Sequence, residues 1–313
     1  MSLLGEGLHA LLPWEGSPLA FAAAAGALVL YGRGWYRLGR RTGVLRPIAF
    51  LAGVLLPYAF LETRLEYYAL HLFWLQRIEH LVLHHLAPFL IALSGPAAVL
   101  ERGSPRWLLQ RVWQPLVTHR AVRATYRVLQ QPVVASVLFV GLIYFWLIPA
   151  VQLDTMLSRA EYQLMNASML LDGLLFWWLM VGPEDPRREV RLTPVARMII
   201  LVLITVPQSV LGGFIAFHHT VLYPAFSLCG RPASISALTD QQIGGLNIWI
   251  PAGMMSALGL IVVIGRAMAS SESPSAPSAS PPRRASGGTT AARPGTVPRA
   301  QPDAAPAGGS GSV

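Results

Sequence analysis

The chain has 313 residues, of which 53% are hydrophobic and only 12% charged, and its mean hydropathy is +0.48. Water-soluble domains carry a charged fraction nearer a quarter, so this composition excludes an ordinary soluble protein and indicates an integral membrane protein. The net charge of +9 does not indicate nucleic-acid binding, because membrane topology accounts for where the arginines fall.

Apolar runs of roughly 20 residues predict membrane-spanning helices, whereas a closed barrel would show short alternating segments. We expect an all-α membrane protein in which residues 1–268 form a bundle of seven transmembrane helices. The seven predicted spans cover residues 18–38, 46–62, 74–95, 132–152, 161–182, 194–218 and 242–266. Residues 269–313 are rich in Pro, Ser, Ala and Gly and predict a disordered cytoplasmic tail.

The arginines predict the orientation of the bundle. All 24 basic residues are arginine, and 20 of them fall in alternate connections or after the last span. The four that remain for the other side are Arg64, Arg77, Arg159 and Arg231. Because basic residues gather on the cytoplasmic side, we expect the N-terminus outside and the C-terminus in the cytoplasm.

The connection between spans three and four has a composition of its own. Residues 101–130 place Trp107, Trp113 and Leu116 among several arginines. This pattern is typical of an amphipathic element that lies on the anionic inner leaflet.

Span three carries polar residues among its leucines. His80 and His84 are four residues apart and share one helix face, with Gln76 above them and Glu79 alongside, whereas His85 points about 100° away from His84. Hydrogen-bonded interior histidines are the ordinary interpretation of such residues. Three imidazoles within six residues, in the outer half of the span, instead favour a metal site in the bundle interior.

Other spans supply further candidates at a similar depth. His218 and His219 lie at the outer end of span six, and span five contains Asp172, for which we expect a partner. Met165 and Met169 share a stripe with Asp172; they are either ordinary packing residues or thioether ligands for soft Cu(I).

Span seven begins with "LTDQQIGGLNIW". Asp240 is either the N-cap of this helix or a residue that supports the site, and Gln241 lies beside it. Gly244 and Gly245 predict close helix contact. With Cys229 as the single cysteine, a cysteine-rich metal cage is excluded, so any site must use His, Met and carboxylates.

The segments "EHLVLHHLAPFLIALSGP", "DGLLFWW" and "DQQIGGLNIWIPAG", on spans three, five and seven, together resemble the membrane-integral CtaG type of cytochrome c oxidase assembly factor. The resemblance covers residues 15–266 in overall plan. It implies a multi-pass protein of the bacterial inner membrane that supplies copper during maturation of a haem-copper oxidase. Its partners would be oxidase subunits or a copper chaperone, together with the lipid bilayer. The Gln-His of the family corresponds to Glu79 and His80, and its Asp-Gln to Asp240 and Gln241.

Two departures from the family pattern remove expected ligands. The first histidine of the family's H-x-x-Q-H is Gln76 here, and its H-x-x-E-H on span five is replaced by Tyr162, Met165 and Asn166. Either the site has shifted inward, toward the other histidines, or this chain has lost the metal.

We therefore expect a copper-handling assembly factor and not an enzyme, since no nucleophile and base are suitably arranged. The predicted metal ligands are His80, His84, His85, His218 and His219. The predicted supporting residues are Gln76, Glu79, Asp172, Asp240, Gln241, Met165 and Met169, with Asp172 orienting an imidazole. The alternatives are a haem-binding electron-transfer subunit, a metal or proton transporter, and a purely structural scaffold.

Overall fold

The computed structural model describes residues 12–13, 16–39, 43–183, 192–227, 230 and 234–271, and all the regular elements in these ranges are helical. The chain divides into two units, Met1–Glu272 and Ser273–Val313, and the helices belong to the first. The predicted tail, 269–313, lies outside the described residues except for 269–271, which end the last helix. Cys229 and Arg231 also lie outside the described residues.

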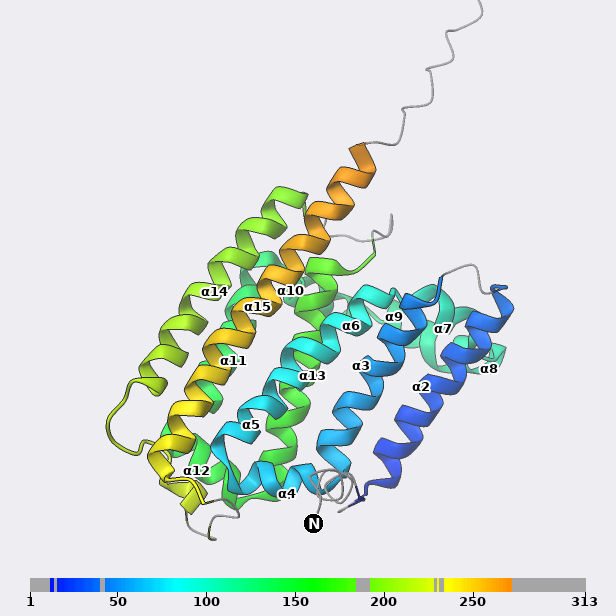
Figure 1. Ribbon diagram of the computed structural model, residues 1–313. Helices are drawn as coiled ribbons and strands as arrows, with labels where there is room; N and C mark the ends of the chain where they lie inside the picture. Colours follow the sequence, from blue (N-terminus) through cyan, green and yellow to red (C-terminus); the bar gives the residue numbers. More distant parts are fainter. Residues whose placement is uncertain are drawn as a thin grey trace, which may run out of the picture. The chain divides into compact units, whose positions relative to one another are not determined.

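The helices follow the predicted order along the chain (Figure 1). They are α2 (Pro18–Arg37), α3 (Leu45–Glu62), α4 (Arg64–His71), α5 (Phe73–His80), the π-helical turn η1 (Leu81–Leu86), α6 (Ala87–Ser94), α7 (Ala97–Gly103), α8 (Arg106–Leu108), the π-helical η2 (Leu109–Trp113), α9 (Gln114–Thr118), α10 (Arg120–Leu129), α11 (Pro132–Trp146), α12 (Pro149–Leu157), α13 (Arg159–Val181), α14 (Pro194–Ala216), the 3-10 turn η3 (Pro224–Ser227) and α15 (Ala237–Ser271).

Local sequence explains where the long helices begin. Ser17, Ser158 and Thr193 each accept a backbone N–H from the first turn of α2, α13 and α14. A proline follows the cap in α2 and α14, where its missing N–H costs nothing because that position has no partner within the helix.

The protein is a multi-pass membrane protein. Four described helices, α3, α13, α14 and α15, are long and apolar enough to cross a membrane. Two bent pairs raise the number to six if each pair is one span: Phe73–Ser94 with Ala97–Gly103, bent by 68°, and Arg120–Leu129 with Pro132–Trp146, bent by 75°. The helix α2 has 20 residues but is not among them. The number of seven spans and the orientation of the termini stay predictions.

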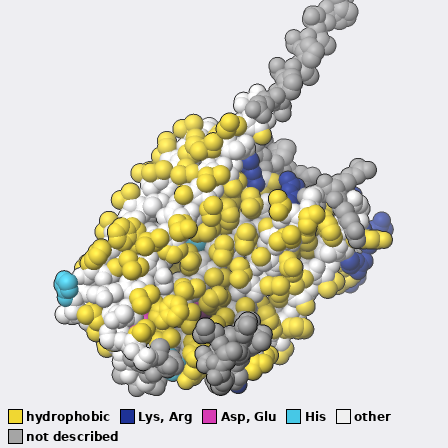
Figure 2. All heavy atoms as spheres, viewed as in Figure 1, with side chains coloured by type: hydrophobic (Ala, Val, Ile, Leu, Met, Phe, Trp, Pro, Cys, Tyr) yellow, Lys and Arg dark blue, Asp and Glu magenta, His cyan; other side chains and the backbone are white. Residues whose placement is uncertain are grey.

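On the face that Figure 2 shows, the positive charge is concentrated toward one end of the bundle. Most of the arginine side chains in Figure 2 gather toward the end of the bundle where Figure 1 shows α7, α8 and α9. Hydrophobic side chains cover much of the remaining visible face, as a lipid-facing surface requires.

The helices α14 and α15 run side by side, and glycines bring them close together (Figure 1). A Cβ on Gly212 would lie 2.7 Å from the backbone nitrogen of Trp249, and one on Gly245 would lie 2.4 Å from that of Ala216. The neighbouring Gly244 faces the ring of Phe73 on α5. The close helix contact expected at Gly244 and Gly245 is therefore present.

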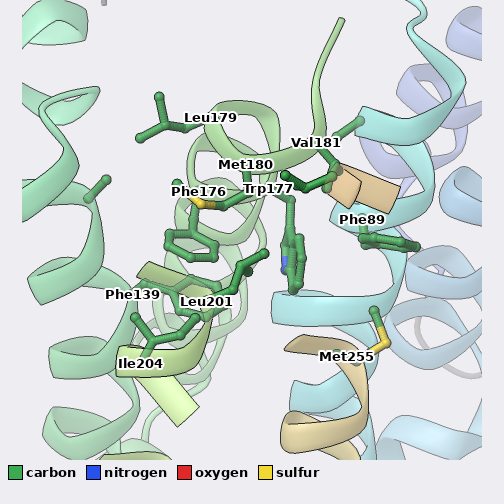
Figure 3. Close-up of a cluster of buried hydrophobic side chains, with 13 residues drawn as sticks. Phe89, Phe139, Phe176, Trp177, Leu179, Met180, Val181, Leu201, Ile204 and Met255 are labelled. Atoms are coloured by element: carbon green, nitrogen blue, oxygen red, sulfur yellow. The ribbon is translucent and has the colours of Figure 1, made fainter. Parts of the chain in front are cut away.

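An aromatic cluster holds α6, α11 and α13 together (Figure 3). Phe139 stacks on Phe176 with ring centroids 3.9 Å apart, and Trp177 meets Phe89 edge to face at 5.1 Å. Since lipid chains are as apolar as these side chains, the cluster stabilises the bundle mainly through close packing. Phe139 also stacks on His84, with ring centroids 4.1 Å apart, so the core directly supports the polar site.

Candidate functional site

The segment that carries the histidines is not a regular α-helix. Residues Leu81–Leu86 form a π-helical turn, and the N–H of Ala87 bonds to the carbonyl of Val82, five residues earlier. Pro88 has no N–H to bond to the carbonyl of His84, which removes one bond that would enforce α-helical geometry. Gly173 of α13 packs against that carbonyl, since a Cβ there would lie 2.4 Å from it. Turns of this kind recur at functional sites.

The π-helical turn changes where His85 points. In a regular α-helix it would diverge by about 100° from His84. Each residue of the wider turn advances less around the helix axis, and the structure places His80, His84 and His85 on the wall of the same cavity. The rings of His84 and His85 meet edge to face with centroids 5.1 Å apart.

This cavity lies between η1 and five other helices, α5, α11, α13, α14 and α15, and has a volume of about 30 Å³. It has room for about two water molecules. The lining residues are Arg77, His80, Leu81, His84, His85, Ile143, Met169, Gln208, Asn247, Ile248 and Ala252.

Buried polar atoms that lack a partner are concentrated in the cavity wall. Within the described part of the chain, no hydrogen-bond partner exists for Nδ1 and Nε2 of His80, Nδ1 of His84, Nδ1 of His85, Nε of Arg77, or Oε1 and Nε2 of Gln208. Such atoms are uncommon in folded proteins, and each requires an explanation such as an unseen water or ion. Together they indicate that this cavity is built for something polar.

Asp172 of α13 is the partner of His84. Its Oδ2 lies 3.0 Å from Nε2 of His84, and the His84 side chain is only 1% exposed. Because the carboxylate accepts the Nε2–H, this contact favours the tautomer in which Nδ1 of His84 carries a lone pair. This Nδ1 is the nitrogen of His84 that has no hydrogen-bond partner among the described residues.

The residues that depart from the family pattern contact one another. Tyr162 donates its hydroxyl to Oε2 of Glu79 at 2.7 Å, and Asn166 donates Nδ2 to Oε1 at 2.8 Å. Both carboxylate oxygens of Glu79 are thus occupied by α13, and Glu79 does not line the cavity. In this chain these residues join α5 to α13 through hydrogen bonds.

Gln76 lies at the centre of a second polar group. Its Oε1 accepts from Nη2 of Arg77 and, at 3.0 Å, from Nε2 of Gln152, while its own Nε2 donates to the sulfur of Met156 at 3.3 Å. The Arg77 guanidinium also lies over the ring of Phe73, 4.8 Å from its centroid. These contacts hold the positively charged side chain of Arg77 at the cavity wall.

Asp240 caps a helix, but not its own. Ser236 accepts the N–H of Thr239 at the start of α15, whereas Asp240, one turn further on, accepts the N–H groups of Phe73 and Trp74 at 3.1 and 2.8 Å. It therefore stabilises the N-terminus of α5, the helix that carries His80.

Two further residues of α15 join segments distant in sequence. Gln241 donates to the carbonyl of Thr220 and accepts the N–H of Leu222 at 2.6 Å, which ties the loop after α14 to the start of α15. Asn247 donates to the carbonyl of Trp74 at 3.1 Å. The Asp-Gln segment supports the site by holding its scaffold.

Met165 and Met169 of α13 have different surroundings. Met165 is fully buried in an apolar cluster with Phe73, Leu83 and Tyr162. Met169 lines the cavity beside the histidines.

The structure does not bring His218 or His219 to the cavity. His219 is exposed, and the half-buried His218 packs its ring 5.1 Å from that of Phe214, which is itself 57% exposed. Gln208 is the residue of α14 that lines the cavity. At a rise of 1.5 Å per residue, a helix would carry the chain about 15 Å from Gln208 to His218.

Three polar residues of the cavity wall were missing from the expected site: Arg77, Gln208 and Asn247. The topology predicts Arg77 on the outer side of the membrane, and the structure buries it within the bundle, with only 3% of it exposed. Gln208 is a polar residue within an apolar span, next to Pro207, and the depth argument used for Asp172 would have identified it.

Among the described residues, no three His, Cys, Asp or Glu side chains already form a group that could hold a metal ion. The possible donors that line the same cavity are the imidazole nitrogens of η1 and α5 and the thioether of Met169.

No curated protein and no solved structure matches this chain. One protein family does: the model of the cytochrome c oxidase caa3 assembly factor family matches residues 29–270, which include every helix of the site. This agrees with the resemblance carried by spans three, five and seven, and it suggests a non-catalytic role. The chain belongs to the cytochrome c oxidase caa3 assembly factor family.

Proposed function

We propose that this chain binds Cu(I) in the cavity at η1 and delivers it during assembly of a haem-copper oxidase. The ligands would come from His80, His84, His85 and Met169. The observation that carries the proposal is the convergence of unpartnered imidazole nitrogens on one small cavity. Such groups are costly inside a membrane, and a bound ion would offset that cost.

The donor set favours Cu(I). Imidazole and thioether together suit copper, and the thioether selects its reduced form. Cu(I) accepts low coordination numbers, so two imidazoles and one thioether suffice, without a third His, Cys or carboxylate. Arg77 is also part of the wall and repels a divalent ion more strongly than a monovalent one.

Asp172 would act on the site through His84. By accepting the Nε2–H, it leaves Nδ1 as the metal-binding nitrogen and raises the basicity of the ring. The positive charge of Arg77, which is also in the cavity wall, repels a bound copper ion and so limits its affinity. Moderate affinity suits a protein that must pass its ion to an oxidase subunit.

The haem alternative is not favoured, because a cavity of about 30 Å³ cannot hold a porphyrin, and neither His218 nor His219, which follow α14, lines the cavity with the histidines of η1. We propose that His218 and His219 are not ligands.

The test is Cu(I) binding to the purified full chain under anaerobic reducing conditions, measured by competition with a coloured Cu(I) chelator. The double variant His80→Ala/His84→Ala should lose stoichiometric retention. The matched control His218→Ala/His219→Ala removes the same number of imidazoles outside the cavity and should bind like wild type. Full binding by the first variant, or loss of binding only in the second, would refute the assignment.

A cellular experiment tests the role in assembly. In a strain that lacks this chain, wild type and the control variant should restore copper-dependent oxidase activity, whereas the cavity variant should not. If all three restored oxidase activity equally, oxidase assembly would not depend on copper binding at this cavity.

A further inference from the structure

Most of the surface of the segment from α8 to α10 is exposed. Every residue from 110 to 128 is exposed, although the segment is helical nearly throughout. The exposed side chains include large apolar ones, among them Trp107 at 61%, Trp113 at 54% and Leu116 at 48%. An ordered helical segment that exposes large apolar side chains requires contact with something outside the bundle.

The charge of this segment has one sign. Between Glu101 and Asp154 the sequence contains no Asp or Glu. The same stretch carries six arginines, at positions 102, 106, 111, 120, 123 and 127. The segment therefore presents positive charge together with tryptophan, the combination found in helices that lie in the membrane interface.

The path of the chain supplies a third, independent observation. The helix α10 meets α11 at 75°, and α7 leaves the histidine-bearing helices at 68°. If α11 crosses the bilayer, a helix at 75° to it runs nearly along the membrane surface. Gln130 fixes this corner by donating to the carbonyl of Leu175 on α13 at 2.9 Å.

We propose that residues 106–129 form a binding surface for anionic phospholipid headgroups. Arg106, Arg111 and Arg120 contact the headgroup phosphates, and Trp107 and Trp113 insert at the boundary between headgroups and acyl chains. Attraction between basic residues and anionic lipid acts near the surface and weakens with salt. The surface thereby holds the α7–α10 connection against one leaflet.

The experiment compares lipid selectivity of the full chain reconstituted in vesicles of phosphatidylcholine that contain spin-labelled phosphatidylglycerol or spin-labelled phosphatidylcholine. The variant Arg106→Gln/Arg111→Gln/Arg120→Gln should lose preference for phosphatidylglycerol by up to about a hundredfold at low salt, because each basic residue contributes about one factor of five. The matched control Arg283→Gln/Arg284→Gln/Arg293→Gln removes the same charge from the tail and should keep the wild-type preference.

Hydrogen exchange gives a second measurement that does not depend on the variants. Amides of residues 106–129 should be more protected in nanodiscs with phosphatidylglycerol than in nanodiscs of phosphatidylcholine alone, and added salt should reduce the difference. Equal protection in both lipids, equal loss of selectivity in the two triple variants, or protection that appears only after oxidase subunits are added would overturn the proposal.

Discussion

The contact between Gly173 and the π-helical turn predicts the effect of a single methyl group. In Gly173→Ala the new Cβ would lie 2.4 Å from the His84 carbonyl oxygen and 2.9 Å from Cγ of Pro88. Ordinary contacts begin near 3.4 Å, so α13 and η1 must separate by about 1 Å. The contact between His84 and Asp172, now 3.0 Å, would then lengthen beyond hydrogen-bonding distance.

Overpacking of this kind costs about 1–3 kcal/mol, so we expect the thermal transition of the detergent-solubilised protein to fall. Loss of the carboxylate contact should weaken Cu(I) binding by about 10–100-fold. Both are measured on one preparation, by a thermal unfolding scan and by chelator competition. The control is Gly141→Ala on α11, where a Cβ has no neighbour within 4 Å. Wild-type stability and copper affinity in Gly173→Ala would show that the close approach of α13 does not shape the site.

Three further changes test other parts of the scaffold. Asp172→Asn keeps the shape but removes the charge, and it should weaken Cu(I) binding by about tenfold without changing the ligands seen by X-ray absorption; unchanged affinity would contradict the role of Asp172. Asp240→Ala leaves two N–H groups of α5 without an acceptor and should lower the unfolding free energy by about 1–3 kcal/mol, read as a lower thermal transition, with Asp240→Asn in between. Burial raises the pKa of Tyr223, in the loop before η3, to about 12 from 10.0, despite the opposing effect of Arg77. Its folded state resists ionisation, so stability should fall as the pH rises from 10 to 12, and Tyr223→Phe should lose this part of the pH dependence; parallel thermal profiles of the two proteins would contradict this.

Much of the fold follows from local sequence. Apolar runs place the long helices because in lipid every backbone polar group must bond within its own segment. The depth of a residue also follows from its position in such a run, and this places Asp172 at the depth of His84 and His85. The motifs on three spans predicted the family, and the family match confirms it.

The pairing of side chains depends on the rotation of each helix about its axis, which local sequence does not determine. Depth alone made His218 a candidate beside His84, yet the structure turns Gln208 of α14 toward the cavity. In the same way Asp240 had a good local role as the cap of its own helix, and only the packing of α15 against α5 gives it the amides of Phe73 and Trp74.

The direction of His85 shows most clearly what the sequence by itself determined and what it did not. Three imidazoles within six residues were sufficient to predict a polar site in span three. A periodicity of 3.6 residues turns His85 about 100° away from His84, although the sequence still counts His85 among the predicted ligands. Pro88 removes one helical bond, but the π-helical turn also depends on Gly173 of another helix pressing against the same carbonyl. Local sequence therefore determined which residues form the polar site. Contacts between helices decided that their side chains line one cavity.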